Sequence, residues 1–230
     1  MSKSTEAGRA FVTYALSIGA IKLIPAGITL KSGRLSPYFF NSGLFYMAEA
    51  TEALATTYAE AISLADERGK LKPNVIFGPA YKAIPIAVMT ACILRHEGYD
   101  GIAWAHDRKE EKDHGDGGIL VGAPLSGKRV IIVDDVITDG KSKRTAVDRI
   151  RGAGGEPVAC VIAFDRQERG NDPNDPRPSS ARFQEEFGIP VLAAATLDDL
   201  IQVLEEGPAV PLAAETLPLI LQYRDQYGVG

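Results

Sequence analysis

The pattern of apolar positions sets one part of the chain apart. From Pro73 to Gly207, short continuous apolar runs alternate with longer stretches of helical spacing. Continuous runs are typical of strands covered on both faces, and helical spacing is typical of amphipathic helices. The pattern predicts strands over 74–77, 101–106, 129–135, 157–164 and 189–195, and helices over 84–98, 141–155 and 196–207. Strands alternating with helices indicate an α/β fold, with a Rossmann-like parallel sheet flanked by helices.

The segments outside this alternation have a different character. Helical spacing predicts helices over 10–18 and 51–64. Gly, Ser and Pro among aromatic residues indicate short strands and turns over 28–46. A polar, proline-rich patch at 171–182 is expected to be a surface loop. Residues 217–230 are expected to contain a helix that docks on the rest of the chain.

Composition limits the classes of function. The 230 residues carry a net charge of −5 and are 45% hydrophobic, which disfavours a general nucleic-acid or membrane-surface binder. No apolar run approaches a membrane span, and the N-terminal segment lacks the apolar core of a secretion signal, so we expect a cytoplasmic protein. Cys92 and Cys160 lie in separate apolar runs without metal-ligand spacing, so we expect two buried reduced thiols.

The segment RVIIVDDVITDGKS, residues 129–142, carries the most specific chemistry. Its predicted strand ends on Asp134 and Asp135, and Gly140 then leads into a helix. Ligands of open parallel sheets bind beyond the carboxyl ends of the strands, and the N–H groups at a helix N-terminus favour an anion. Acids beside such an anion are tolerated if they accept hydrogen bonds from sugar hydroxyls. The segment therefore indicates a ribose 5-phosphate site.

Two other interpretations of this segment are open. The first is an ordinary capped helix that follows a strand, with Asp134 and Asp135 as surface acids. The second is a nucleotide-binding P-loop, which fits poorly because Asp135 stands where its first glycine is needed. Another P-loop-like segment, at 122–129, ends on Arg129 where Ser or Thr would bind magnesium.

A second polar segment, DRKEEKDHGDGG at 107–118, has eight charged residues and one histidine in twelve positions. Such runs are most often solvated surface loops. Its lysines and histidine would also suit pyrophosphate if the loop folded over a ligand, and its glycines would allow the backbone changes of a lid.

Five segments, in order along the chain, resemble the orotate phosphoribosyltransferase family of type I phosphoribosyltransferases: LKSGRLSPYFFNSGLF, GPAYKAIPIA, DRKEEKDHGDGG, VDDVITDGKS and FDRQERG. The resemblance implies transfer of a 5-phosphoribosyl group from 5-phosphoribosyl-1-pyrophosphate (PRPP) to orotate. The products would be orotidine 5-phosphate and pyrophosphate, in pyrimidine (UMP) biosynthesis. It also implies a single domain over 1–230, with a type I phosphoribosyltransferase core of roughly 72–195 and a small hood lobe from the N-terminal segment and the C-terminal helix.

The resemblance implies roles for particular residues. The PRPP cradle would consist of Asp134, Asp135, Val136, Ile137, Thr138, Asp139, Gly140, Lys141 and Ser142. The pyrophosphate side would have Tyr81 and Lys82, with Lys31 near PRPP. The orotate site would have Phe39, Phe40, Thr138 and Arg166. A mobile catalytic loop, 107–118, would contribute Arg108, Lys109, Lys112 and His114. Lys109, Asp134 and Asp135 are the implied catalytic residues.

The resemblance further implies Mg²⁺, held mainly by PRPP and water, and a homodimer in which the loop 107–118 serves the neighbouring subunit. Positive charge would develop on the ribose as pyrophosphate leaves, and magnesium and the loop cations would stabilise the departing negative charge. No general base is assigned, since orotate arrives as an anion. No nucleic acid or membrane partner is expected.

Some of these roles have structural alternatives. Arg166 suits a planar carboxylate, and a salt bridge within DRQER is an equal alternative from the residues alone. Phe39 and Phe40 are, by residue type, core aromatics. Asp139 and Lys141 depart from the family pattern, which usually has Ala and a small or hydroxyl residue there. The alternative functions are a PRPP-binding regulator and a purine-type phosphoribosyltransferase.

Overall fold

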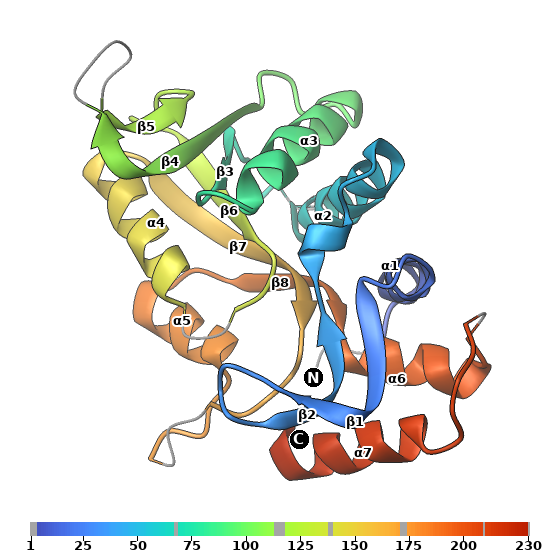
Figure 1. Ribbon diagram of the computed structural model, residues 1–230. Helices are drawn as coiled ribbons and strands as arrows, with labels where there is room; N and C mark the ends of the chain where they lie inside the picture. The colour runs from blue at the N-terminus through green and yellow to red at the C-terminus, as the bar shows by residue number, and fades with distance from the viewer. Residues whose placement is uncertain are drawn as a thin grey trace.

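The structure is a computed structural model that describes residues 4–66, 69–112, 118–137, 140–170, 174–208 and 210–229. Six strands form one sheet in the order β5-β4-β3-β6-β7-β8, and all neighbours are parallel except β4 and β5 (Figure 1). The strands are β3 (Val75–Gly78), β4 (Ala103–Lys112), β5 (Gly118–Gly122), β6 (Arg129–Asp134), β7 (Glu156–Asp165) and β8 (Val191–Thr196). This arrangement confirms the predicted Rossmann-like fold, with helices on both faces of a mostly parallel sheet.

Each face of the sheet has its own hydrophobic cluster, because successive side chains of a strand point to opposite faces. Ile131 and Val133 of β6 face a cluster shared with α1, α2, α3 and α6, whereas Val130 and Ile132 face α4 and α5. The helices are α1 (Glu6–Ser17), α2 (Ala48–Asp66), α3 (Ala83–His96), α4 (Lys141–Gly152), α5 (Ser179–Phe187) and α6 (Leu197–Glu206). The continuous apolar run of β6 reflects this burial on both faces.

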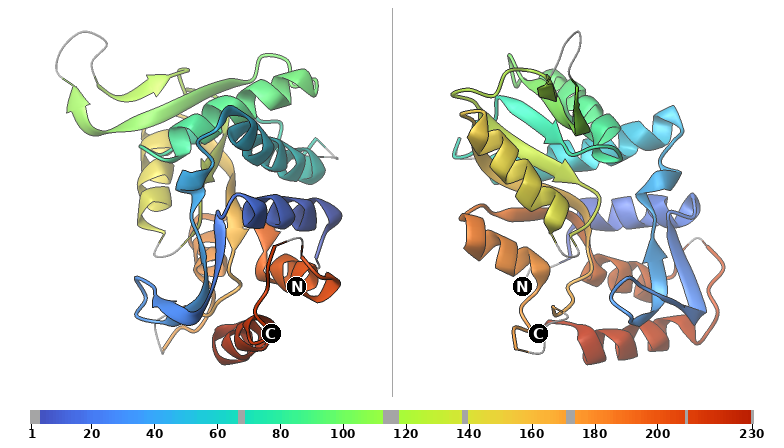
Figure 2. Two further views of the ribbon diagram at one scale, coloured as in Figure 1. Left: turned by 45° about the vertical axis from the view of Figure 1, so that its right-hand side comes forward. Right: turned by 60° about the vertical axis from the view of Figure 1, so that its left-hand side comes forward.

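A second, two-stranded sheet lies beside the carboxyl ends of the central strands (Figures 1 and 2). It pairs β1 (Ile21–Thr29) with β2 (Leu35–Phe40), and α7 (Thr216–Tyr227) packs against it. The short 3-10 helix η1 (Ser42–Leu44) then leads to α2. Side chains of β2 and α7 belong to the same hydrophobic cluster as α1 and α2, so the small sheet and the large one share a continuous core.

Three sequence predictions were wrong in detail. Residues 107–112 continue β4 and Gly118 begins β5, so most of the predicted loop 107–118 belongs to an antiparallel hairpin. Lys109, Glu110 and Glu111 are tolerated in this strand because they are exposed to water at the edge of the sheet. Residues 179–182 of the predicted loop 171–182 begin α5. Cys160 is buried, but Cys92 is exposed on α3.

No helix among the described residues is long and apolar enough to cross a membrane.

Candidate active site

Two turns meet where the strand order changes direction. The chain places β4 on one side of β3 and β6 on the other, so the crevice between β3 and β6 is the topological switch point. Residues 79–82 follow β3 at this edge, and residues 135–140 follow β6. The Nζ of Lys82 lies 3.6 Å from Oδ2 of Asp135, so the two turns are in ionic contact. Open α/β sheets bind their ligands at this position.

The turn after β6 enters α4 through Gly140, which has a φ of 71° in the left-handed region. Glycine adopts this conformation without steric cost, and it has no side chain with which to cap the helix. The first N–H groups of α4 therefore donate no hydrogen bond to an N-cap side chain. These N–H groups lie at the same edge of the sheet as Asp135. Lys141 and Ser142, in the first turn of α4, are exposed. Helix entrances of this kind favour phosphate.

The two adjacent acids have different environments. The Oδ1 of Asp134 accepts a hydrogen bond from the N–H of Asp135 at 3.0 Å, and its Oδ2 accepts one from Ser142 Oγ at 3.0 Å. The same Oδ2 is ion-paired with Nζ of Lys143, and this lysine side chain is only 4% exposed. Tyr58 donates its hydroxyl to the Asp134 carbonyl at 2.6 Å, and burial raises the pKa of this phenol well above its usual value. Asp134 is thus held by the protein.

Asp135 is the more accessible acid, with a side chain 20% exposed. Its Oδ1 accepts a hydrogen bond from the N–H of Val136 at 2.9 Å, and its Oδ2 accepts one from the hydroxyl of Ser42 at 2.9 Å. Because Ser42 belongs to η1, this bond connects the segment after β2 with the switch point. Of the two acids, Asp135 is better placed to meet a ligand hydroxyl.

Asp107 connects three parts of the site. Its buried carboxylate accepts a hydrogen bond from the N–H of Ala80 at 2.7 Å and is ion-paired with Arg149 of α4. The turn after β3, the base of the β4–β5 hairpin and α4 are therefore joined through one side chain. Beyond this base, Nζ of Lys109 lies 5.9 Å from the ring centroid of Tyr81, and Arg108 donates to the carbonyl of Gly118 at 2.9 Å.

Three further predicted site residues lie in turns. Val136 and Ile137 are partly buried in the turn after β6, and Lys31 is exposed in the turn between β1 and β2. Thr138, Asp139 and His114 lie outside the described residues, as does the side chain of Lys112.

The two phenylalanines of β2 point in opposite directions. Phe40 lies on the same face as Ser36 and Tyr38, is buried, and stacks on Phe164 with ring centroids 5.7 Å apart. Phe39 lies on the other face and is partly buried. Adjacent residues of a strand alternate in this way, so the two rings face opposite sides of β2. The ring of Phe40 is a core aromatic.

Arg166 follows β7 and is enclosed by side chains of the small sheet and α7. Its Nε donates to Glu168 Oε1 at 2.6 Å, and its Nη2 donates to Ser36 Oγ at 2.8 Å. The guanidinium lies over the Tyr38 ring, 4.1 Å from the centroid. The salt bridge within DRQER is therefore present, and its partner is Glu168.

Comparison with known proteins agrees with this geometry. The family model of the phosphoribosyl transferase domain matches residues 47–192. The orotate phosphoribosyltransferase of Stenotrophomonas maltophilia is 47% identical over 219 residues, which cover 95% of each chain. This chain belongs to the orotate phosphoribosyltransferase family.

Solved structures of this family have the same fold. The crystal structure of the Francisella tularensis orotate phosphoribosyltransferase superposes with a TM-score of 0.79 at 30% identity, over 96% of this chain and 100% of that one. The Mycobacterium tuberculosis orotate phosphoribosyltransferase in complex with PRPP superposes with a TM-score of 0.58 at 22% identity, over 84% of this chain and 98% of that one. At that identity the likeness concerns the fold alone.

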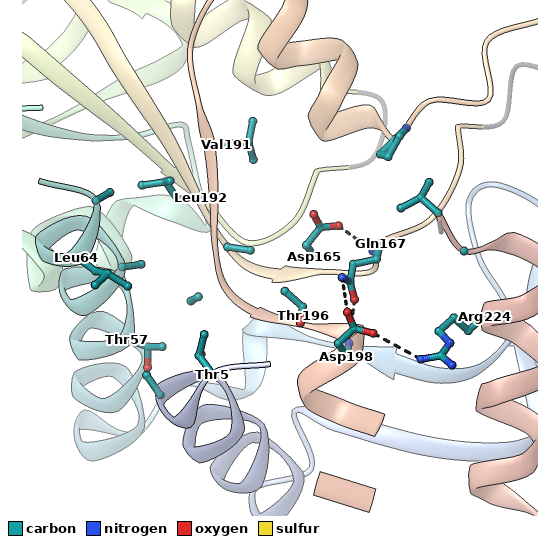
Figure 3. Close-up of a pocket in the computed structure, with 18 of the residues that line it drawn as sticks. Thr5, Thr57, Leu64, Asp165, Gln167, Val191, Leu192, Thr196, Asp198 and Arg224 are labelled. Atoms are coloured by element: carbon teal, nitrogen blue, oxygen red, sulfur yellow. Dashed lines mark hydrogen bonds and ion pairs between the residues drawn. The ribbon is translucent and has the colours of Figure 1, made fainter. Parts of the chain in front are cut away.

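A separate cavity of about 1060 Å³ lies among α1, α2, β8 and the C-terminal segment, and contains none of the predicted site residues (Figure 3). Its polar side chains contact one another: Gln167 donates to Asp198 Oδ2 at 3.0 Å, and Arg224 lies 3.6 Å from Asp198 Oδ1. The described residues of the predicted phosphate-binding turn therefore lie at the switch-point edge and outside this cavity.

Sequence reasoning overlooked the contacts of Ser42, Lys143 and Asp107. Only proximity offered a signal: Lys143 follows the predicted cradle directly, and Asp107 opens the predicted loop. Nothing in the residue order shows that Ser42 bonds to Asp135, that Lys143 pairs with Asp134 or that Asp107 bonds to Ala80. The pairing of Arg166 with Glu168, in contrast, was one of the two alternatives that the sequence left open.

Proposed function

We propose that this chain transfers the 5-phosphoribosyl group of PRPP to orotate, giving orotidine 5-phosphate and pyrophosphate in pyrimidine biosynthesis. The observation that supports this most is the contact of Lys82 with Asp135 at the switch point, beside the uncapped entrance to α4. Lys82, Asp135 and the N-terminus of α4, which can bind an anion, thus lie together at the carboxyl edge of the sheet. Family membership supplies the identity of the two substrates.

The proposed roles follow from these positions. The N–H groups at the start of α4 bind the 5-phosphate, with Thr138, Asp139, Lys141 and Ser142 around it. Asp135 accepts hydrogen bonds from the ribose hydroxyls, and Asp134, fixed by Lys143, shapes the turn that carries it. Tyr81 and Lys82 serve the pyrophosphate side, Lys31 is near PRPP, and Arg166 binds the orotate carboxylate.

The protein contributes to this reaction mainly by electrostatic stabilisation of the leaving group. As the bond to pyrophosphate breaks, negative charge grows on the leaving group, and Lys109 with the other cations of the hairpin stabilises it. Closure of the hairpin over the site excludes water that would otherwise hydrolyse the activated sugar.

Mg²⁺ fits as a partner of the substrate. Within the described residues, no group of three or more His, Cys, Asp or Glu side chains could hold a metal ion. Mg²⁺ commonly uses one or two carboxylates together with substrate phosphates and retained waters, and Asp135 is a partly exposed carboxylate at this edge. Bound in this way, Mg²⁺ would neutralise charge on the pyrophosphate.

We also propose a homodimer in which the hairpin, including the predicted contacts Arg108, Lys109, Lys112 and His114, serves the neighbouring subunit. The whole chain then acts as one domain, with a core of roughly 72–195 and a hood of β1, β2 and α7. The core shared by the two sheets supports the single domain. Mixing Lys109→Ala with Asp135→Asn subunits tests the sharing: proven heterodimers without recovered activity would contradict it.

One assay tests the proposed function. Purified protein is mixed with PRPP and Mg²⁺, and orotate, uracil, adenine and hypoxanthine are offered separately while base absorbance and pyrophosphate are followed. We expect loss of orotate absorbance with equal release of pyrophosphate. Turnover of a purine base in place of orotate would assign a purine-type enzyme. PRPP binding without pyrophosphate release from any base would favour a regulator.

A further inference from the structure

Glu168 joins the hood to the proposed orotate site. Its side chain is 12% exposed, and its Oε1 accepts hydrogen bonds from Arg166 Nε at 2.6 Å and from the hydroxyl of Tyr223 at 3.0 Å. Its Oε2 accepts a bond from Nη1 of Arg34 at 2.9 Å. One carboxylate thus holds two guanidinium groups, so the three ionised side chains together have a net positive charge.

The contacts around Arg166 leave one nitrogen for a ligand. Nε is bonded to Glu168, and Nη2 donates to Ser36 at 2.8 Å and to the hydroxyl of Tyr223 at 3.3 Å. The ring of Tyr38 lies beneath the guanidinium plane. In the part of the chain that the structure describes, Nη1 donates no hydrogen bond to protein. The plane of the guanidinium is therefore fixed, and Nη1 has two N–H groups that can donate to a ligand.

We propose that Glu168 is a positioning residue that presents Nη1 of Arg166 to the carboxylate of the pyrimidine acceptor. This inference rests on the proposed function. A free arginine loses considerable rotamer freedom when it binds, and an arginine held in advance has already lost it. Charged hydrogen bonds also require alignment, which the Glu168 contact supplies. Because Arg34 balances Glu168, the cluster keeps the positive charge that attracts an anionic acceptor.

Arg34 shares the carboxylate but belongs to a different part of the hood. Its Nη2 donates to the carbonyls of Arg169 at 2.9 Å and Gly170 at 3.2 Å, so it ties the end of the β1–β2 turn to the segment after β7. Glu168 is the group that Arg34 and Arg166 have in common. Replacing Glu168 therefore affects Arg166 directly, whereas exposed acids elsewhere do not.

The test is steady-state kinetics of the full-length Glu168→Gln variant with PRPP, Mg²⁺ and either orotate or uracil. The amide keeps the size of the side chain and loses its charge. We expect the orotate KM to rise about tenfold, the PRPP KM to stay within about twofold, and the preference in kcat/KM for orotate over uracil to fall. Glu156→Gln is the matched control, because Glu156 pairs with Arg129 at the opposite edge of the sheet.

A milder variant keeps the test decisive if Glu168→Gln folds poorly. Tyr223→Phe removes one donor to Glu168 and one contact of Arg166, and we expect about a threefold rise in orotate KM with the melting temperature retained. An orotate KM within twofold of the wild type in both variants would overturn the inference, as would an equal rise in the PRPP KM. Absence of orotate turnover by the wild type would instead overturn the proposed function, and this inference with it.

Discussion

Removal of the Lys143 ammonium is predicted to destabilise the fold strongly. Lys143→Met keeps most of the side-chain volume and leaves Asp134 as a buried carboxylate without its cation. Breaking a buried ion pair by removing one partner costs about 3–5 kcal/mol. For a chain of this size each kcal/mol corresponds to about 2–4 °C in Tm, so we expect Tm to fall by about 6–20 °C.

The double substitution separates pairing from packing. Asp134→Asn alone leaves a buried ammonium and should also lower Tm, whereas Lys143→Met with Asp134→Asn removes both charges and should recover most of the loss. Calorimetry of the wild type, both single variants and the double variant measures the coupling. Lys128→Met, at an exposed position, is the control and should change stability by less than about 0.5 kcal/mol. Additive losses in the double variant would refute the reasoning.

Three further predictions concern other parts of the molecule. Burial raises the pKa of Cys160 to about 12, so at neutral pH an aromatic disulfide reagent should react with one thiol of the native protein, that of exposed Cys92. After unfolding it should react with both thiols, and rapid reaction of two thiols in the native protein would contradict this. Gly78→Ala should lower stability by about 1–3 kcal/mol or more, since the new Cβ would meet the carbonyl of the residue that begins α3. Gly152→Ala, whose Cβ meets nothing within 4 Å, should be neutral or stabilising, and equal losses in the two denaturation curves would refute the steric argument. Lys109→Ala should slow kcat much more than it weakens PRPP binding measured by calorimetry, because its contact strengthens as charge develops; wild-type turnover would exclude Lys109 from the mechanism.

The parallel strands could be predicted because burial on both faces leaves a direct trace in the sequence. The run before Asp134 is continuous and β-branched, and it forms β6 as expected. In contrast, β5 is short and bounded by glycines, and it pairs with charged residues of β4, so neither apolar spacing nor composition distinguishes it from a loop. Its position depends on a partner strand that the local pattern does not reveal.

The candidate site could be predicted only in part, for a related reason. Asp135 and Gly140 are fixed by strand and helix ends that are visible in the sequence. Asp107 acquires its position through Arg149, 42 residues away, and Arg166 acquires its orientation through Ser36 of the small sheet. Such contacts arise from tertiary packing, which residue spacing alone does not encode.

We propose that the turn between β6 and α4 binds the phosphate of the activated sugar while Asp135 accepts hydrogen bonds from its hydroxyls. The most direct measurement is a crystal structure of the protein with PRPP and Mg²⁺. We expect density for the 5-phosphate against the N–H groups at the start of α4, and for the ribose within hydrogen-bonding distance of Asp135. PRPP bound elsewhere, for example in the cavity beside β8, with this turn empty, would contradict it.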